Sequence, residues 1–125
     1  MLQFEKRHDE ILQSFPMQAW MSRYDADGNP PEESEELSLS ALRYLFFIAQ
    51  IYHLHKKRLV MRAAWKIMNN EITRTLQSPL FKREWKKFAD EFRVDREFFS
   101  FVEGTQQQTK GPKSIENSLN LKEEI

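Results

Sequence analysis

Two residues near the start of the chain have the spacing of metal ligands. Glu5 and His8 form a Glu-x-x-His pair, a ligand pattern of di-metal helix bundles. Such a centre needs a second matching pair and further carboxylates. The other histidines, His53 and His55, are two residues apart and point in different directions on a helix, and residues 37–89 hold only two acids. We therefore expect no metal site.

The acidic stretch 25–36, DADGNPPEESEE, is a second candidate for cation binding. Four of its residues occupy the first, third, fifth and twelfth positions of an EF-hand calcium loop: Asp25, Asp27, Asn29 and Glu36. The sixth position of that loop needs glycine for its sharp turn, and this chain has Pro30 there. The stretch is therefore predicted to be an acidic linker.

The chain offers little for covalent catalysis or nucleotide binding. It has no cysteine and no G-x-S-x-G motif. Its glycines are at positions 28, 104 and 111, too far apart to form a loop that cradles phosphate. We expect a protein that is not an enzyme and needs no cofactor.

Charge is distributed unevenly along the chain although it sums to zero. Residues 1–36 hold 3 basic and 9 acidic side chains, residues 37–89 hold 11 and 2, and residues 90–125 hold 5 and 8. Such an uneven distribution of charge can direct binding to an anionic surface, or the segments can neutralise one another within the fold.

Eight cations of the middle segment form two groups, which are the candidate site for an anionic partner: Lys56, Lys57, Arg58 and Arg62, then Lys82, Arg83, Lys86 and Lys87. If the helices that carry them pack antiparallel, both groups would share one positive face. That face could meet nucleic-acid phosphates or acidic lipid head groups. The alternative is two solvated faces, partly neutralised by the acids at 32–36.

The element that must position these groups is the apolar stretch 37–54. Between Ala41 and Tyr52 only Arg43 and Gln50 are polar, so a helix here is apolar on nearly every side. It is short for a bilayer span and contains an arginine, so we expect no transmembrane segment. The sequence predicts instead the central buried helix of a small all-α domain, at residues 38–55, with Phe46 inside.

Helical spacing predicts the elements on either side. Residues 2–15 form an amphipathic helix, and Met17 to Tyr24 continue as a new helix with Ser14 as its cap or as a kinked extension. Val60, Met61 and five later apolar residues mark one face of a long helix that ends at Leu76.

A second stop and restart follows at Ser78, where Pro79 is predicted to be the first residue of a helix with an aromatic stripe from Phe81 to Phe92. Asp95 is predicted to cap a last helix, which ends at Gly104.

These elements predict a bundle of about five helices in one domain. The predicted segments are an N-terminal amphipathic part at 1–24, the acidic linker at 25–36, the helical core at 37–104 and a disordered tail at 105–125.

Several stretches between residues 39 and 103 carry a family likeness. They are ALRYLFFIAQIYHLHKKRLV, then WKIMNNEI, then SPLFKREW, and a closing pattern approximated by Phe98, Phe101, Val102 and Glu103. Here the chain resembles a group of bacterial helical domains of unknown function. The resemblance implies a helical module, often found behind a membrane-spanning segment, and it supplies no catalytic residues. This chain departs from that arrangement because we expect no span.

Charge and architecture together predict a non-enzymatic helical interaction or regulatory module, which binds a protein partner or a membrane-associated complex. The alternative is a small nucleic-acid-binding protein that uses the basic clusters at 53–62 and 82–87. The first residues, MLQFEKRHDEI, lack the apolar run of a secretory signal or anchor. We expect a cytoplasmic location, with peripheral membrane contact as the second possibility.

Overall fold

The computed structural model describes residues 2–25 and 27–108, with side chains from residue 6 onward. Within these ranges the chain is all-α, as the sequence predicts, and has no strand. The helices are α1 (Leu2–Ser14), α2 (Met17–Met21), α3 (Glu35–Lys56), α4 (Arg62–Leu76), α5 (Pro79–Phe88) and α6 (Arg96–Gln107), with 3-10 turns η1 (Ser22–Tyr24) and η2 (Ala89–Phe92).

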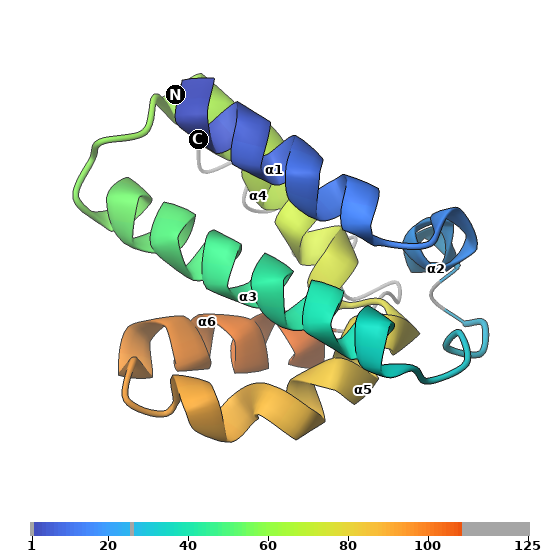
Figure 1. Cartoon of the computed structure of the whole chain (residues 1–125). Helices are drawn as coiled ribbons and strands as arrows, with labels where there is room; N and C mark the ends of the chain where they lie inside the picture. The colour runs from blue at the N-terminus through green and yellow to red at the C-terminus, as the bar shows by residue number, and fades with distance from the viewer. Residues whose placement is uncertain (1, 26, 109–125) are drawn as a thin grey trace.

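Helix α3 runs through the middle of the molecule, with α1 on one side and α5 and α6 on the other (Figure 1). Nine of its residues are buried, which confirms its prediction as the central helix. By length and composition alone α3 could also cross a membrane, a test that core helices of globular proteins pass as well.

The start of α3 is set by its cap. The Leu37 amide donates to Ser34 Oγ at 3.1 Å, and two glutamates occupy the first turn, where the helix dipole favours negative charge. The helix therefore begins at Glu35, inside the predicted linker. The linker is correspondingly shorter than the predicted 25–36.

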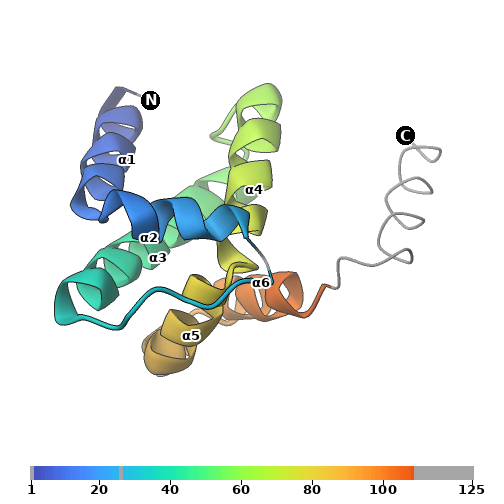
Figure 2. The same ribbon diagram turned by 90° about the vertical axis from the view of Figure 1, so that its right-hand side faces the viewer.

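The junction after α1 matches neither of the two alternatives. Pro16 has extended dihedral angles and is itself the N-cap of α2, so α1 and α2 are separate helices. Ser14 does not cap α2. Its hydroxyl donates to Ile11 O at 2.6 Å and lies 2.9 Å from Ser40 Oγ, and the Ser40 hydroxyl donates to Ser14 O at 3.2 Å, which ties the end of α1 to α3. Figure 2 shows how α2 and η1 then cross from α1 towards α4.

Two helix starts are confirmed. Ser78 Oγ accepts a hydrogen bond from the Phe81 amide at 3.3 Å with Pro79 in the first turn, and Asp95 Oδ1 accepts from the Phe98 amide at 3.2 Å. The predicted start of the long helix at Val60 is wrong. Helix α4 begins only at Arg62, and Met61 is its N-cap.

The predicted end of the last helix at Gly104 is also wrong. Helix α6 continues to Gln107, and Thr105 is buried. The side-chain Nε2 of Gln106 donates to Leu76 O at 3.1 Å and to Phe81 O at 3.3 Å, so it satisfies carbonyls of α4 and α5. Residues 105–108 therefore belong to the folded bundle, and the rest of the predicted tail lies outside the described residues.

Aromatic side chains fill the core. Phe81, Trp85 and Phe92 are buried, as the aromatic stripe predicts, and Phe98 packs between Trp85 and Tyr52. The placement of Phe46 inside the core is wrong. Its side chain is 45% exposed and its ring lies 4.9 Å from that of Phe92, so the described residues cover this side of α3 only in part.

Candidate functional site

The first basic cluster lies at the turn between α3 and α4, which we call the basic tip and define as residues 55–62. The turn closes α3 with two backbone hydrogen bonds, from the Leu59 amide to Leu54 O and from the Arg58 amide to His55 O, each 2.9 Å long. This is the Schellman pattern of helix ends. The tip is thus an ordered corner at one end of the molecule (Figure 1).

Arg58 occupies the position of this motif that usually holds glycine. Its φ is 61°, in the left-handed region that costs an L-residue about 1–2 kcal/mol. The chain nevertheless has an exposed cation at this position. Strain of this kind is often retained where a side chain has a function.

The four cations of the tip are Lys56, Lys57, Arg58 and Arg62. All four are exposed, and none forms an ion pair with an acid of the described residues. No acidic residue lies in the first turn of α4. The tip therefore keeps its positive charge available to a partner.

His55 helps to hold the tip together. Its ring stacks on Trp65 of α4, with centroids 3.9 Å apart and planes 7° apart. Burial, and then the neighbouring Lys56, lower the pKa of His55 below its ordinary value, so the ring is neutral at pH 7. Beside it lies an open hollow of about 480 Å³, whose walls are His55, Lys56, Arg58, Val60 and Arg62.

Arg58→Gly should separate the two roles of Arg58. Glycine adopts the left-handed conformation freely, so we expect the free energy of unfolding to rise by about 0.5–1 kcal/mol. Retention on an immobilised polyanion should fall at the same time, because one cation is lost. Urea denaturation and salt elution measure the two effects, and a loss of stability would show that the arginine side chain makes stabilising contacts.

The second basic cluster is partly neutralised inside the fold. Arg83 Nε lies 2.8 Å from Glu84 Oε2, and Lys87 Nζ lies 2.5 Å from Glu33 Oε1 and 3.2 Å from Glu84 Oε2. Arg83 also donates to the carbonyl of Pro31. The hydrogen bond from Lys87 lowers the pKa of Glu33, and the same bond raises the pKa of Lys87. These pairs fasten the linker to α5.

The two clusters do not form one face. Lys87 donates to Ser38 at the start of α3, whereas Lys56 is in its last turn. At about 1.5 Å per residue the helix separates these points by roughly 27 Å. Of the second cluster, Lys82 and Lys86 remain exposed on α5. The sequence-based hypothesis of a continuous positive face is wrong.

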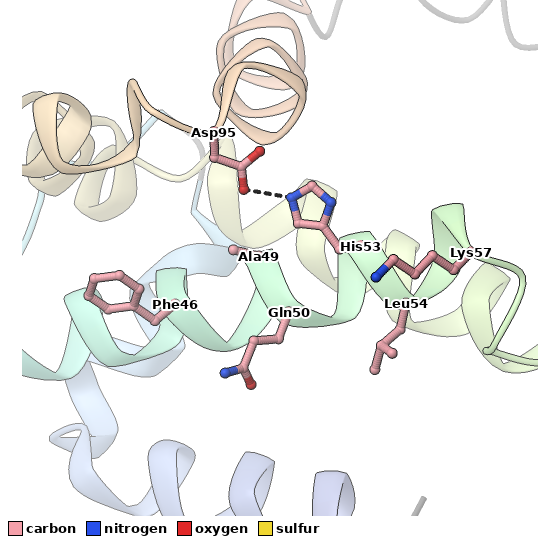
Figure 3. Close-up of a pocket in the computed structure, with 7 residues that line it drawn as sticks. All are labelled: Phe46, Ala49, Gln50, His53, Leu54, Lys57 and Asp95. Carbon is pink, nitrogen blue, oxygen red and sulfur yellow. Dashed lines mark hydrogen bonds and ion pairs between the residues drawn. The ribbon is translucent and has the colours of Figure 1, made fainter.

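A further hollow of about 500 Å³ lies on the open side of α3 (Figure 3). His53 Nε2 is 2.6 Å from Asp95 Oδ2 at its wall, and Phe46, Gln50, Leu54 and Lys57 line the rest with Ala49. A His–Asp pair can orient an imidazole as a base. The seven lining residues include no hydroxyl or thiol for it to activate. Asp95 is also the N-cap of α6, so the pair ties α3 to α6.

Sequence reasoning missed a part-buried polar group that joins α1, η1 and α4. His8 Nε2 of α1 lies 3.1 Å from Glu71 Oε1 of α4, and the buried Arg23 donates to Thr75 Oγ1 at 2.9 Å beside them. The Glu71 hydrogen bond raises the pKa of His8 against the opposing effect of burial. Burial raises the pKa of the nearby Tyr44 hydroxyl far above its usual range, so it stays neutral. The sequence pattern around His8 does not indicate that its partner is Glu71 of α4.

Metal coordination gains no support from this arrangement. Across residues 6–25 and 27–108, no three histidine, aspartate or glutamate side chains come together as a metal site would require. His8 instead pairs with Glu71, and His53 with Asp95.

Comparison with known proteins gives no family. No protein-family model, no curated protein and no solved structure matches this chain. The resemblance to bacterial helical domains therefore stays a prediction, and the function has to be argued from the site itself.

Proposed function

We propose that this protein is a non-enzymatic helical interaction module, which attaches through the basic tip to an anionic surface of a membrane-associated complex. The observation that carries the proposal is the contrast between the two basic clusters. In the second, Arg83 and Lys87 pair with acids of the same fold. None of the four cations of the tip forms an ion pair with an acid of the described residues.

The ordered geometry of the tip supports the same proposal. The Schellman turn and the His55–Trp65 stack hold the four cations in place before any partner arrives. Binding to a preformed surface costs less conformational entropy than ordering a flexible tail. A partner with phosphate or carboxylate groups would meet the cations together.

Charge reversal tests the proposal with a matched control. K56E/K57E and K82E/K86E each convert two exposed lysines to glutamate, so both change the net charge by the same amount. Each cation near an anionic surface contributes about 1 kcal/mol, so K56E/K57E should weaken binding to immobilised heparin about 30-fold or more. K82E/K86E should elute close to the unmodified protein.

Two outcomes of the same elution experiment would contradict the proposal. If both variants shift equally, only net charge matters and the tip is not the binding surface. If neither shifts, the protein does not bind anions through either cluster. Preferred binding of duplex DNA over anionic vesicles would instead favour the nucleic-acid alternative. Aromatic side chains that stack on the bases of single strands must be exposed, and Phe81 and Trp85 are buried here.

A further inference from the structure

The basic tip also exposes two apolar side chains, Leu59 and Met61, on either side of the half-buried Val60. Leu59, Val60 and Met61 lie between Arg58 and Arg62, so cations precede and follow them in the chain. Leu59 is 67% exposed and Met61 is 74% exposed. Isolated exposed apolar residues are common on protein surfaces, but these two lie two positions apart and are flanked by exposed cations.

The fold holds these side chains outward. The Leu59 amide is fixed by its hydrogen bond to Leu54 O, and Met61 is the N-cap of α4 with φ −58° and ψ 139°. The His55–Trp65 stack joins the two helices just behind the turn. The aliphatic residues are thus part of an ordered corner, and their exposure follows from the backbone geometry.

The chemistry of the partner follows from having both kinds of group at one corner. Nucleic acids and acidic peptides supply negative charge, but the tip would leave Leu59 and Met61 in water against them. The surface of an anionic bilayer supplies both environments, phosphates in the head groups and an apolar phase a few ångströms deeper. The cations and the exposed apolar side chains of the tip therefore match the boundary between the head groups and the acyl chains of an anionic bilayer.

We propose that the basic tip docks on an anionic lipid bilayer, with Leu59 and Met61 entering the acyl boundary while the four cations contact lipid phosphates. The hollow formed by His55, Lys56, Arg58, Val60 and Arg62 has room for a head group. This inference rests on the proposed function, because the same cations make the anionic contact. It specifies the partner and adds a hydrophobic component to the binding.

Aliphatic substitution tests the hydrophobic component. L59S/M61S keeps every charge of the tip, and M17S/M21S is the matched control because it removes two exposed side chains from α2, at the opposite end of the molecule (Figure 1). Binding is measured by sedimentation with phosphatidylcholine vesicles, with and without phosphatidylserine. At physiological salt L59S/M61S should bind the anionic vesicles about tenfold more weakly, and M17S/M21S should bind as the unmodified protein does.

Salt distinguishes insertion from charge attraction alone. Screening should weaken the electrostatic contacts of every variant, but apolar contacts persist at high salt. The unmodified protein should therefore retain more vesicle binding at high salt than L59S/M61S. Equal binding of these two proteins at all salt concentrations would overturn the insertion model.

A fluorescent probe tests depth directly. The chain has no cysteine, so L59C and M17C each provide a single labelling site for an environment-sensitive fluorophore. With anionic vesicles the probe at 59 should shift to shorter wavelength and be quenched by lipids brominated in their acyl chains, whereas the probe at 17 should not change. A probe at 59 that stays in a water-like environment on bound vesicles would overturn the inference.

The experiments separate this inference from the proposed function. If K56E/K57E weakens heparin binding but the unmodified protein does not bind anionic vesicles, the anionic contact stands and the lipid partner is wrong. If the vesicles bind without insertion of residue 59, the hydrophobic component is wrong. If the unmodified protein binds neither heparin nor anionic vesicles, both proposals fail.

Discussion

Phe98→Ala is expected to lower the free energy of unfolding by about 3–5 kcal/mol. The Phe98 side chain is completely buried, and its ring lies 5.5 Å from Phe92, 6.0 Å from Tyr52 and 6.4 Å from Trp85, centroid to centroid. Truncation removes apolar contacts to α3, α5 and η2 at once and leaves a cavity that rigid neighbours cannot fill. Guanidinium denaturation followed by circular dichroism gives the loss directly.

Phe46→Ala is the matched control for this substitution. Its side chain is 45% exposed and its ring lies 4.9 Å from that of Phe92, centroid to centroid, so the expected loss is about 1 kcal/mol. The two variants remove the same atoms, and only burial differs. A loss as large as that of Phe98→Ala would mean that something covers Phe46 in solution.

The contrast between these two phenylalanines marks the limit of prediction from spacing. The caps at Ser78 and Asp95 were predictable, because each satisfies a backbone amide within a few residues of itself. A helix apolar on all sides, however, does not indicate which side its neighbours leave open. That depends on how α1 and α6 pack against α3, which is decided by contacts distant in sequence.

The sequence was enough to predict which cations form the candidate site, but not how they are arranged in space. The cations of the tip are evident in the sequence, yet Val60 and Met61 fit a helical period and were assigned to α4. The helix end was hidden because Arg58 takes the left-handed position at which glycine normally signals a stop. The separation of the two clusters depends on the course of α5 relative to α3, which spacing does not encode.

Glu84→Gln is expected to lower the free energy of unfolding by about 2–3 kcal/mol at pH 7. The Glu84 side chain is fully buried, and its carboxylate accepts from Ser38 Oγ at 2.5 Å and from Arg83 Nε at 2.8 Å, with Lys87 Nζ at 3.2 Å. A glutamine of the same shape can turn its oxygen toward Arg83 and Lys87 and its NH2 group toward Ser38, but it removes the negative charge that both cations contact. Glu103→Gln should cost about 0.5 kcal/mol or less, since its oxygen can still accept from Trp85 Nε1.

The dependence on pH identifies charge as the cause. Burial acts to raise the pKa of Glu84, but hydrogen bonds from Ser38, Arg83 and Lys87 outweigh it and hold the pKa below the ordinary 4.5. A carboxyl whose pKa is lower in the folded state contributes stability above its unfolded pKa, and this is lost as pH falls through the folded value. The stability difference between the unmodified protein and Glu84→Gln should therefore be constant above about pH 5 and shrink as the pH falls below 4.5. Unfolding curves across this range measure it, and a difference that stays constant to low pH would attribute the loss to packing of the glutamine.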